Sequence, residues 1–187
     1  MKKEIISLSA PLSQKATSKL CAGEEVLISG IIYTARDAAH KRLIDLLHAG
    51  KKLPVDLHEQ IIYYAGPTPV NPETGICSAG PTTSSRMDVY TPELLAKTGL
   101  AAMIGKGNRT APVVDAIKKN KTVYFAAGGG LGALIGKCIV KSELVCWEDL
   151  GPEAIYRFTV KDMPVIVAID SRGNNVYEAG IKKYGKL

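Results

Sequence analysis

The feature that most constrains the fold of this chain is a repeated alternation of short apolar runs with helical patterns, separated by glycine-containing turns. Residues 25–32 carry the continuous apolar pattern of a buried strand. From Thr34 the apolar side chains recur at helical spacing, and Gly50 marks the end of that helix. Thr34 and Asp37 have the spacing of a capping box, which predicts where the helix begins.

The alternation continues through the rest of the chain. Strands or extended segments are predicted at residues 61–65, 74–79, 100–104, 122–127, 143–147, 154–160 and 165–169. Helices are predicted from Thr91 to Gly99, from Thr110 onward, and over residues 131–137. We therefore expect an α/β fold, with a mixed sheet and packed helices, in a single domain over residues 1–187. Residues 182–187 are expected to form a mobile tail.

Length and composition are those of an ordinary globular protein. The chain has 187 residues, of which 46% are hydrophobic and 22% charged. It contains no apolar stretch of the roughly 20 residues that span a bilayer, and no secretory signal, so we expect no membrane association. The four cysteines are Cys21, Cys77, Cys138 and Cys146, and none of them form a CxxC pair. We therefore expect reduced thiols, a cytoplasmic protein and no metal site in this chain.

The net charge of +6 is compatible with nucleic acid, a membrane surface or a small anion as partner. The basic residues are scattered, and Phe occurs only twice, so a basic aromatic surface for nucleic acid is not indicated. Charge does not decide among the other partners.

The segment GPTTSSRMD, residues 80–88, follows a predicted strand and is rich in small and hydroxyl residues. Glycine lets a ligand approach the backbone, Thr82 and Thr83 offer hydroxyl donors, and Arg86 offers a planar fork that fits a carboxylate. The alternative is a tight turn whose Ser and Thr side chains bond locally.

Two further segments suggest an anion site. In IGKGNRT, residues 104–110, Gly105 and Lys106 lie between a strand end and a helix start, which favours negative charge. In TARDAAH, residues 34–40, Arg36 stands at a helix start, where the helix dipole disfavours a cation unless an anion lies opposite. His40 follows one turn later and is a weaker candidate, since a helical His usually packs or faces solvent. The Gly128–Gly130 run lacks dinucleotide-binding spacing.

Taken together, TARDAAHKR, AGP, GPTTSSRMD and IGKG resemble the C-terminal domain, or separate β subunit, of class I fumarases and L-tartrate dehydratases. The resemblance covers most of the chain and is specific at GPTTSSRMD and IGKG. It implies a swivelling β/β/α domain that closes over a [4Fe-4S] cluster held by a cluster-binding α subunit, and hence a hetero-oligomer. No metal ligand is implied in this chain.

The resemblance also implies roles for individual residues. Arg36, Arg86 and Lys106 correspond to a clamp for a C4 dicarboxylate, with Gly105 and Thr83 beside them. Thr82 corresponds to the base that removes the proton next to a carboxylate, although a threonine hydroxyl is a weak base and the alternative is that it only binds substrate.

Three functions therefore stay open. The first is hydration of fumarate to L-malate by a pair of subunits, and the second is dehydration of tartrate by the same arrangement. The third belongs to another class: a domain that binds or senses a small anion without catalysis. A stand-alone domain would bind dicarboxylate by itself, whereas a subunit would need its partner.

Overall fold

The computed structural model describes residues 5–69 and 77–185, and every structural statement below refers to those residues. The elements in chain order are β1 (Ile6–Ala10), α1 (Gln14–Thr17), β2 (Glu25–Thr34), α2 (Asp37–His48), β3 (Ile61–Tyr63), η1 (Ser84–Met87), α3 (Thr91–Thr98), β4 (Ala102–Gly105), α4 (Ala111–Asn120), β5 (Val123–Ala126), α5 (Gly132–Gly136), β6 (Ile139–Cys146), η2 (Glu148–Glu153), β7 (Ile155–Ile169) and α6 (Val176–Tyr184).

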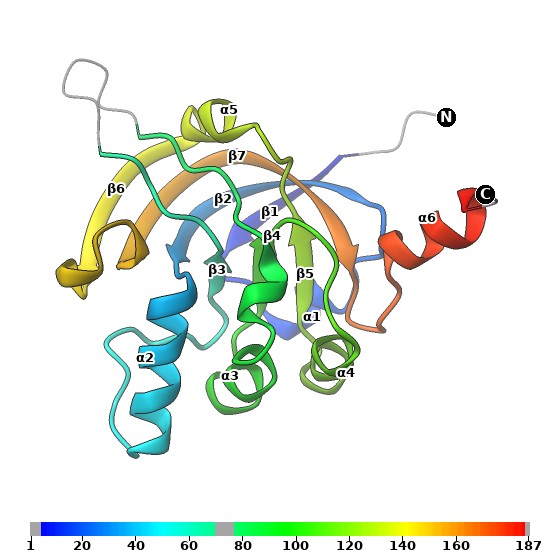
Figure 1. Ribbon diagram of the computed structural model, residues 1–187. Helices are drawn as coiled ribbons and strands as arrows, with labels where there is room; N and C mark the ends of the chain where they lie inside the picture. Colours follow the sequence, from blue (N-terminus) through cyan, green and yellow to red (C-terminus); the bar gives the residue numbers. More distant parts are fainter. Residues whose placement is uncertain (1–4, 70–76, 186–187) are drawn as a thin grey trace.

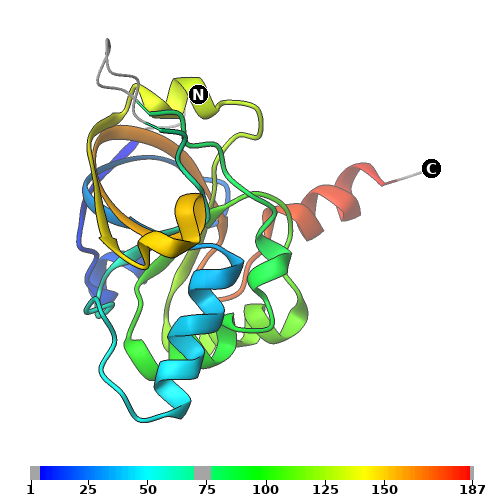
Figure 2. The same cartoon turned by 60° about the vertical axis from the view of Figure 1, so that its left-hand side comes forward.

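One seven-stranded sheet, in the order β1-β2-β3-β4-β5-β7-β6, forms the centre of the molecule. β2, β3, β4 and β5 are parallel neighbours, and β7 lies antiparallel to β5. β7 is long enough to pair with β2 as well, which closes β2, β3, β4, β5 and β7 into a ring (Figures 1 and 2). The predicted α/β fold with a mixed sheet is confirmed, while the expected swivelling movement stays a prediction.

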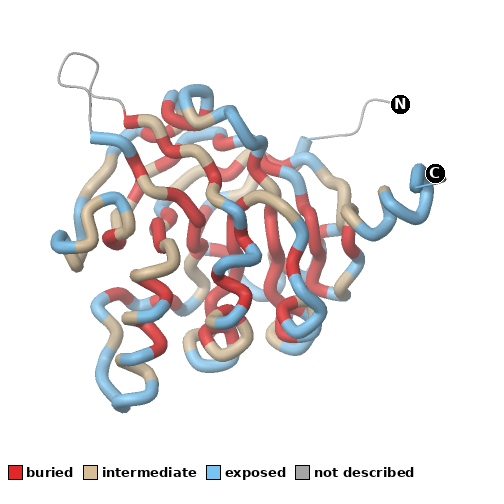
Figure 3. The backbone as a smooth tube through the Cα atoms, viewed as in Figure 1, coloured by how far each residue is buried: buried red, intermediate tan, exposed pale blue. Residues whose placement is uncertain are grey.

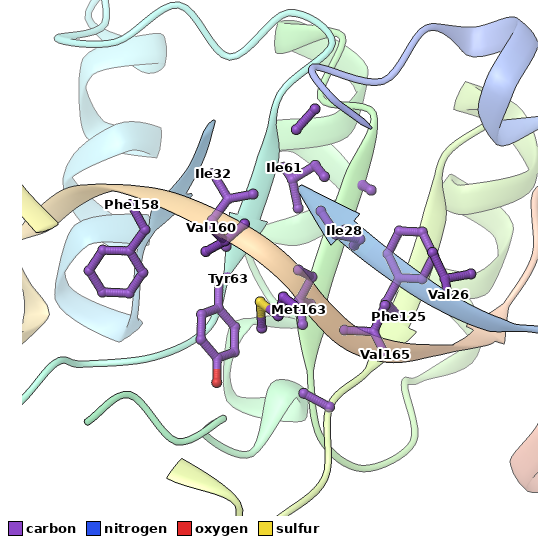
Figure 4. Packing of buried hydrophobic residues seen from close by; sticks show 14 of the residues in the cluster. Val26, Ile28, Ile32, Ile61, Tyr63, Phe125, Phe158, Val160, Met163 and Val165 are labelled. Carbon is purple, nitrogen blue, oxygen red and sulfur yellow. The ribbon is translucent and has the colours of Figure 1, made fainter. Parts of the chain in front are cut away.

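The ring separates two apolar cores, because successive side chains of a strand point to opposite faces. In β3, Ile61 and Tyr63 point into the ring, whereas Ile62 and the following Tyr64 face the helices. Figure 4 shows the inner core, where Phe125 and Phe158 are fully buried. The outer core lies under α2, α3 and α4, which cover one side of the parallel strands (Figures 1 and 3).

The predicted helix boundaries are confirmed where their end signals are local. Gly99 adopts a left-handed conformation after α3, and Thr110 is the N-cap residue of α4. The predicted capping box of α2 is wrong: Thr34 ends β2, and Arg36 is the N-cap residue without a side-chain bond. The carboxylate of Glu153, far along the chain, accepts the Ala38 N–H at 3.0 Å instead.

Four predicted segments do not correspond directly to elements of the structure. The predicted segments 154–160 and 165–169 are joined in the single strand β7, which begins at Ile155. The predicted strand 74–79 extends beyond the described residues, and its described part, 77–79, is irregular. Of the expected tail, residues 182–184 form the end of α6 and residues 186–187 lie outside the described part, so that its mobility stays a prediction. Among the described residues, no helix is both long and apolar enough to cross a membrane.

Candidate functional site

The candidate site lies at the rim of the ring where the parallel strands end. β2 ends at Thr34, β3 at Tyr63 and β4 at Gly105. TARDAAH follows the end of β2 and IGKGNRT contains the end of β4, whereas GPTTSSRMD is held beside the end of β3 by the bridge between Ala65 and Pro81. Ligands of parallel α/β sheets commonly bind outside the carboxyl ends of the strands. The order of the strands therefore brings the segments from TARDAAH, GPTTSSRMD and IGKG to the same edge.

The loops that contain Thr82 and Lys106 are joined directly by backbone hydrogen bonds. Thr83 and Lys106 form a parallel bridge, in which the Lys106 N–H donates to the Thr82 carbonyl at 3.4 Å. The Ser84 N–H donates to the Lys106 carbonyl at 3.0 Å. The structure thus places the hydroxyl-rich loop and the glycine-lysine loop side by side.

The Thr82 hydroxyl is oriented by the backbone of Tyr64. Both the N–H and the Oγ1 of Thr82 donate to the Tyr64 carbonyl, at 2.7 Å and 3.0 Å. Because the hydroxyl hydrogen is used in this bond, the group presents its lone pairs to any other partner. Thr83, the neighbouring candidate, is exposed to solvent.

Gly105 is required by the packing under the same loops. A Cβ at this position would overlap the Ser84 Oγ and would come within 2.9 Å of the Tyr64 ring. Ser84 is fully buried and its hydroxyl lies 2.9 Å from the Tyr124 hydroxyl. Gly105 therefore lets the two loops approach each other closely.

Arg36 and Arg86 are each held by a carboxylate of this chain. The Arg36 Nη2 lies 3.2 Å from a Glu153 oxygen, and the Arg86 Nη2 lies 3.0 Å from an Asp37 oxygen. Arg36 also packs over Gly66 of the AGP segment, where a Cβ would lie 3.0 Å from the guanidinium. Since Arg36 and Asp37 are adjacent, these two pairs connect the start of α2 to η1 and η2.

His40 lies under the site and not on its open surface, since its side chain is fully buried. Its Nδ1 donates to the Arg36 carbonyl at 2.9 Å, which leaves Nε2 as a buried acceptor without a partner among the described residues. Burial is the main cause that lowers the pKa of His40 to about 4, so the ring is neutral at neutral pH. The structure brings the other candidates to the rim but leaves His40 behind the backbone of Arg36.

The family model described as Fumarase C-terminus matches residues 1–180. The chain belongs to this family. The match covers all the segments that form the rim, so that the resemblance expected from the motifs is confirmed.

Relatives of the fumarase C-terminus family differ in length. A protein of Methanocaldococcus jannaschii named as an L(+)-tartrate dehydratase subunit beta is 41% identical, over 94% of this chain and 93% of its own. A Geobacillus stearothermophilus protein named as a class I fumarate hydratase is 39% identical, over 94% of this chain but 34% of its own. The anaerobic class I fumarate hydratase of Escherichia coli is 38% identical, over 33% of its length. The chain thus spans about a third of the fumarate hydratases it matches.

The rim of this fumarase C-terminus domain does not suit an iron–sulfur cluster. Such clusters are bound by several convergent thiolates, whereas the rim presents guanidinium, ammonium and hydroxyl groups. All four cysteines lie in the described part of the chain and are free; burial raises the pKa of three of them, Cys77, Cys138 and Cys146. Within residues 5–69 and 77–185, no group of three or more His, Cys, Asp or Glu side chains could hold a metal ion.

Several residues of the rim were not predicted from the sequence. Glu153 and Asp37 hold the two arginines, but a partner more than a hundred positions away, as Glu153 is for Arg36, leaves no local signal. Arg109 is buried beneath the loops, and it did have a signal. It directly precedes Thr110, the N-cap residue of α4. A cation at the start of a helix is disfavoured by the helix dipole, and the same argument had singled out Arg36.

Proposed function

We propose that this chain is the β subunit of a hydro-lyase that hydrates fumarate to L-malate reversibly. The observation that carries the proposal is the meeting of Arg36, Arg86, Lys106 and Thr82 at one rim, on loops joined by hydrogen bonds and ion pairs. The names of the relatives support lyase chemistry on a four-carbon dicarboxylate.

The cations would act on the charge that develops during the reaction. Removal of a proton next to a carboxylate creates an aci-carboxylate with about two negative charges, and fixed cations stabilise this state more than the substrate. Arg36 and Arg86 offer forked donors for carboxylates, and Lys106 offers a compact charge. We assign these three residues, with Gly105 and Thr83 beside them, to substrate binding.

We assign Thr82 to the reacting carbon. Its hydrogen is already donated to the Tyr64 carbonyl, so the oxygen faces substrate as an acceptor. The Tyr64 carbonyl cannot take up the hydroxyl proton, so Thr82 could act as a base only after losing that proton to another group, and the nearby cations would favour the ionised form. His40, buried behind Arg36, would act on the site only through that residue.

A partner chain completes the proposal. The relative that this chain covers almost completely is named as a subunit beta, which supports a separate partner chain, and the matched region is about a third of the fumarate hydratases. We propose that a separate α subunit supplies the missing part and the [4Fe-4S] cluster, in a cytoplasmic hetero-oligomer. The described residues of the rim offer guanidinium, ammonium and hydroxyl groups, which do not suit such a cluster.

Tartrate is the second candidate substrate, because the relative that this chain covers almost completely is named for it. Both substrates are four-carbon dicarboxylates and need the same cations. A small-anion binding domain is the alternative of another class.

Co-expression of this chain with a cluster-carrying partner, followed by anaerobic reconstitution, tests these functions. Turnover of fumarate, malate and tartrate is measured for the pair and for each chain alone. We expect turnover only in the pair, and the preferred substrate identifies the enzyme. An intact, cluster-loaded pair that turns over none of the three would refute the hydro-lyase proposal, and tight dicarboxylate binding by this chain alone would favour the anion-binding domain.

A further inference from the structure

We propose that Arg109 and Asp88 are positioning residues, which hold the loop of Thr82 and Arg86 and the loop of Lys106 as one rigid unit. The inference rests on the proposed function for its catalytic meaning, because these loops carry the assigned substrate-binding side chains. The link between the loops is a property of this chain and can be tested separately.

The first contact is a buried ion pair between the two loops. The Arg109 side chain has no exposed surface and that of Asp88 is 8% exposed. The Arg109 Nε donates to one Asp88 oxygen at 2.6 Å, and the Thr110 N–H donates to the other at 2.7 Å. Both oxygens of the residue that ends GPTTSSRMD are therefore bonded to the segment that follows Lys106.

The rest of the guanidinium is also bonded. Nη2 donates to the Thr91 hydroxyl at 2.8 Å, and that hydroxyl donates to the Met87 carbonyl at 2.8 Å. The guanidinium carbon lies 5.3 Å from the centre of the Tyr64 ring and 5.0 Å from that of Tyr124, within cation–π range. Arg109 therefore packs against the ring of Tyr64, the residue whose backbone carbonyl accepts the Thr82 hydroxyl.

Tyr124 provides a second connection between the same loops. Its hydroxyl donates to the Gly107 carbonyl at 2.9 Å and lies 2.9 Å from the Ser84 hydroxyl. One loop contributes Ser84 and the other contributes Gly107, with the Tyr124 oxygen between them.

The ion pair of Arg109 and Asp88 fixes more hydrogen-bond partners than the stability of the fold requires. A buried ion pair is costly to desolvate, and an apolar pair of similar volume is often as stable. A planar fork with five donors fixes several partners at once, which a lysine cannot do. The bonds lie within a few residues of Arg86 and Lys106, where a small displacement is costly for catalysis. We infer that the pair serves the geometry of the rim.

The first test uses hydrogen exchange of this chain, with Arg109→Lys and Tyr124→Phe. Tyr124→Phe keeps the ring and removes only the bridging hydroxyl, so it serves even where Arg109→Lys does not fold. In each variant, we expect the amides of residues 82–86 and of residues 105–109 to exchange about tenfold faster than in the wild type. The exchange of β7 amides should be unchanged. Arg172→Lys is the matched control, because Arg172 pairs with the buried Asp170 away from the rim. Unchanged exchange, or an equal increase throughout the chain, would overturn the inference.

The second test uses the reconstituted complex and asks whether the effect of Arg109→Lys on kcat/KM acts through Lys106. A double-mutant cycle combines Arg109→Lys with Lys106→Met. We expect Arg109→Lys alone to lower kcat/KM about tenfold or more. In the Lys106→Met background, the same substitution should change kcat/KM by no more than about twofold. Additive losses, or unaltered kcat/KM in Arg109→Lys, would refute a positioning role. Absence of turnover in the wild-type complex would instead refute the proposed function, and the exchange result would then decide the inference alone.

Discussion

Arg86 is half exposed and paired with Asp37, so its replacement should alter the rim without disturbing the core. We expect Arg86→Ala to lower kcat/KM at least a hundredfold, because a charge-assisted, two-pronged contact to substrate is lost. Steady-state kinetics of the complex measures this loss. Arg42→Ala, which removes a partly buried arginine paired with Asp149, is the control and should leave kcat/KM unchanged. Near-normal turnover of Arg86→Ala would remove Arg86 from the site.

The role assigned to Thr82 depends on its oxygen alone. Thr82→Val keeps the shape of the side chain and should preserve the thermal midpoint within a few degrees, while turnover is lost. Thr82→Ser restores the oxygen and should recover part of the activity. Turnover of Thr82→Val close to that of the wild type would show that the oxygen takes no part in the reaction.

His40 predicts how stability depends on pH. Burial lowers its pKa from 6.5 to about 4, so the unfolded chain takes up the proton first as the pH falls. This contribution to the free energy of unfolding is therefore complete above pH 6.5 and decreases between pH 6.5 and pH 4, by up to about 1.4 kcal/mol per pH unit.

In His40→Asn the amide nitrogen can still donate to the Arg36 carbonyl, but the side chain does not titrate. Urea unfolding at a series of pH values should show a shallower decline for His40→Asn than for the wild type. Equal slopes would mean that the buried ring does not cause the decline.

Among the elements, α2 depends on a cap supplied by η2. The Glu153 carboxylate accepts the Ala38 N–H and also pairs with Arg36. We expect Glu153→Gln to lower the free energy of unfolding by about 1 kcal/mol, since the anion at the N-terminus of α2 is removed, and to lower KM, because substrate no longer competes with Glu153 for Arg36. Glu148→Gln, at an exposed position of η2, is the control. A change in stability without a change in KM would make Glu153 a cap only.

The elements that the sequence predicts well are those with local signals. Glycine ends α3, and the apolar runs of β2, β4 and β5 mark strands within two residues. β7 appeared as two segments because polar Lys161 and Asp162 interrupt the apolar run, and Asp162 takes a positive φ of 51°. Pairing with β2 continues on both sides of this irregularity. That pairing depends on tertiary structure, which a local pattern does not contain.

In the candidate site too, the residues with a local sequence signal could be predicted and those that depend on tertiary contacts could not. Arg36, Thr82, Arg86 and Lys106 could be singled out because each stands in an unusual local setting. The acidic partners of the arginines could not, since Glu153 reaches Arg36 only after the chain has folded. Family resemblance supplied the expected roles, and the structure adds which loops are joined.

At the scale of the whole molecule, closure of the ring by β7 predicts cooperative unfolding. Phe125 is fully buried inside the ring, and Phe125→Ala should lower the free energy of unfolding by about 3–5 kcal/mol. Trp147, the single tryptophan, lies at the start of η2, on another part of the fold. Its fluorescence and the far-ultraviolet circular dichroism should shift to the same lower midpoint. Separate midpoints would show that the ring does not unfold as one unit.

The carboxylates of Asp37 and Glu153 also influence which free anions reach the rim. Each is tethered beside its guanidinium, so its effective concentration there reaches the millimolar range or higher. Chloride or phosphate at millimolar concentration must compete with these built-in counter-ions for one arginine at a time. Under the proposed function, a molecule with two carboxylates would engage both arginines at once and gain from the chelate effect. We therefore expect the internal ion pairs to act as a filter that favours divalent over monovalent ligands.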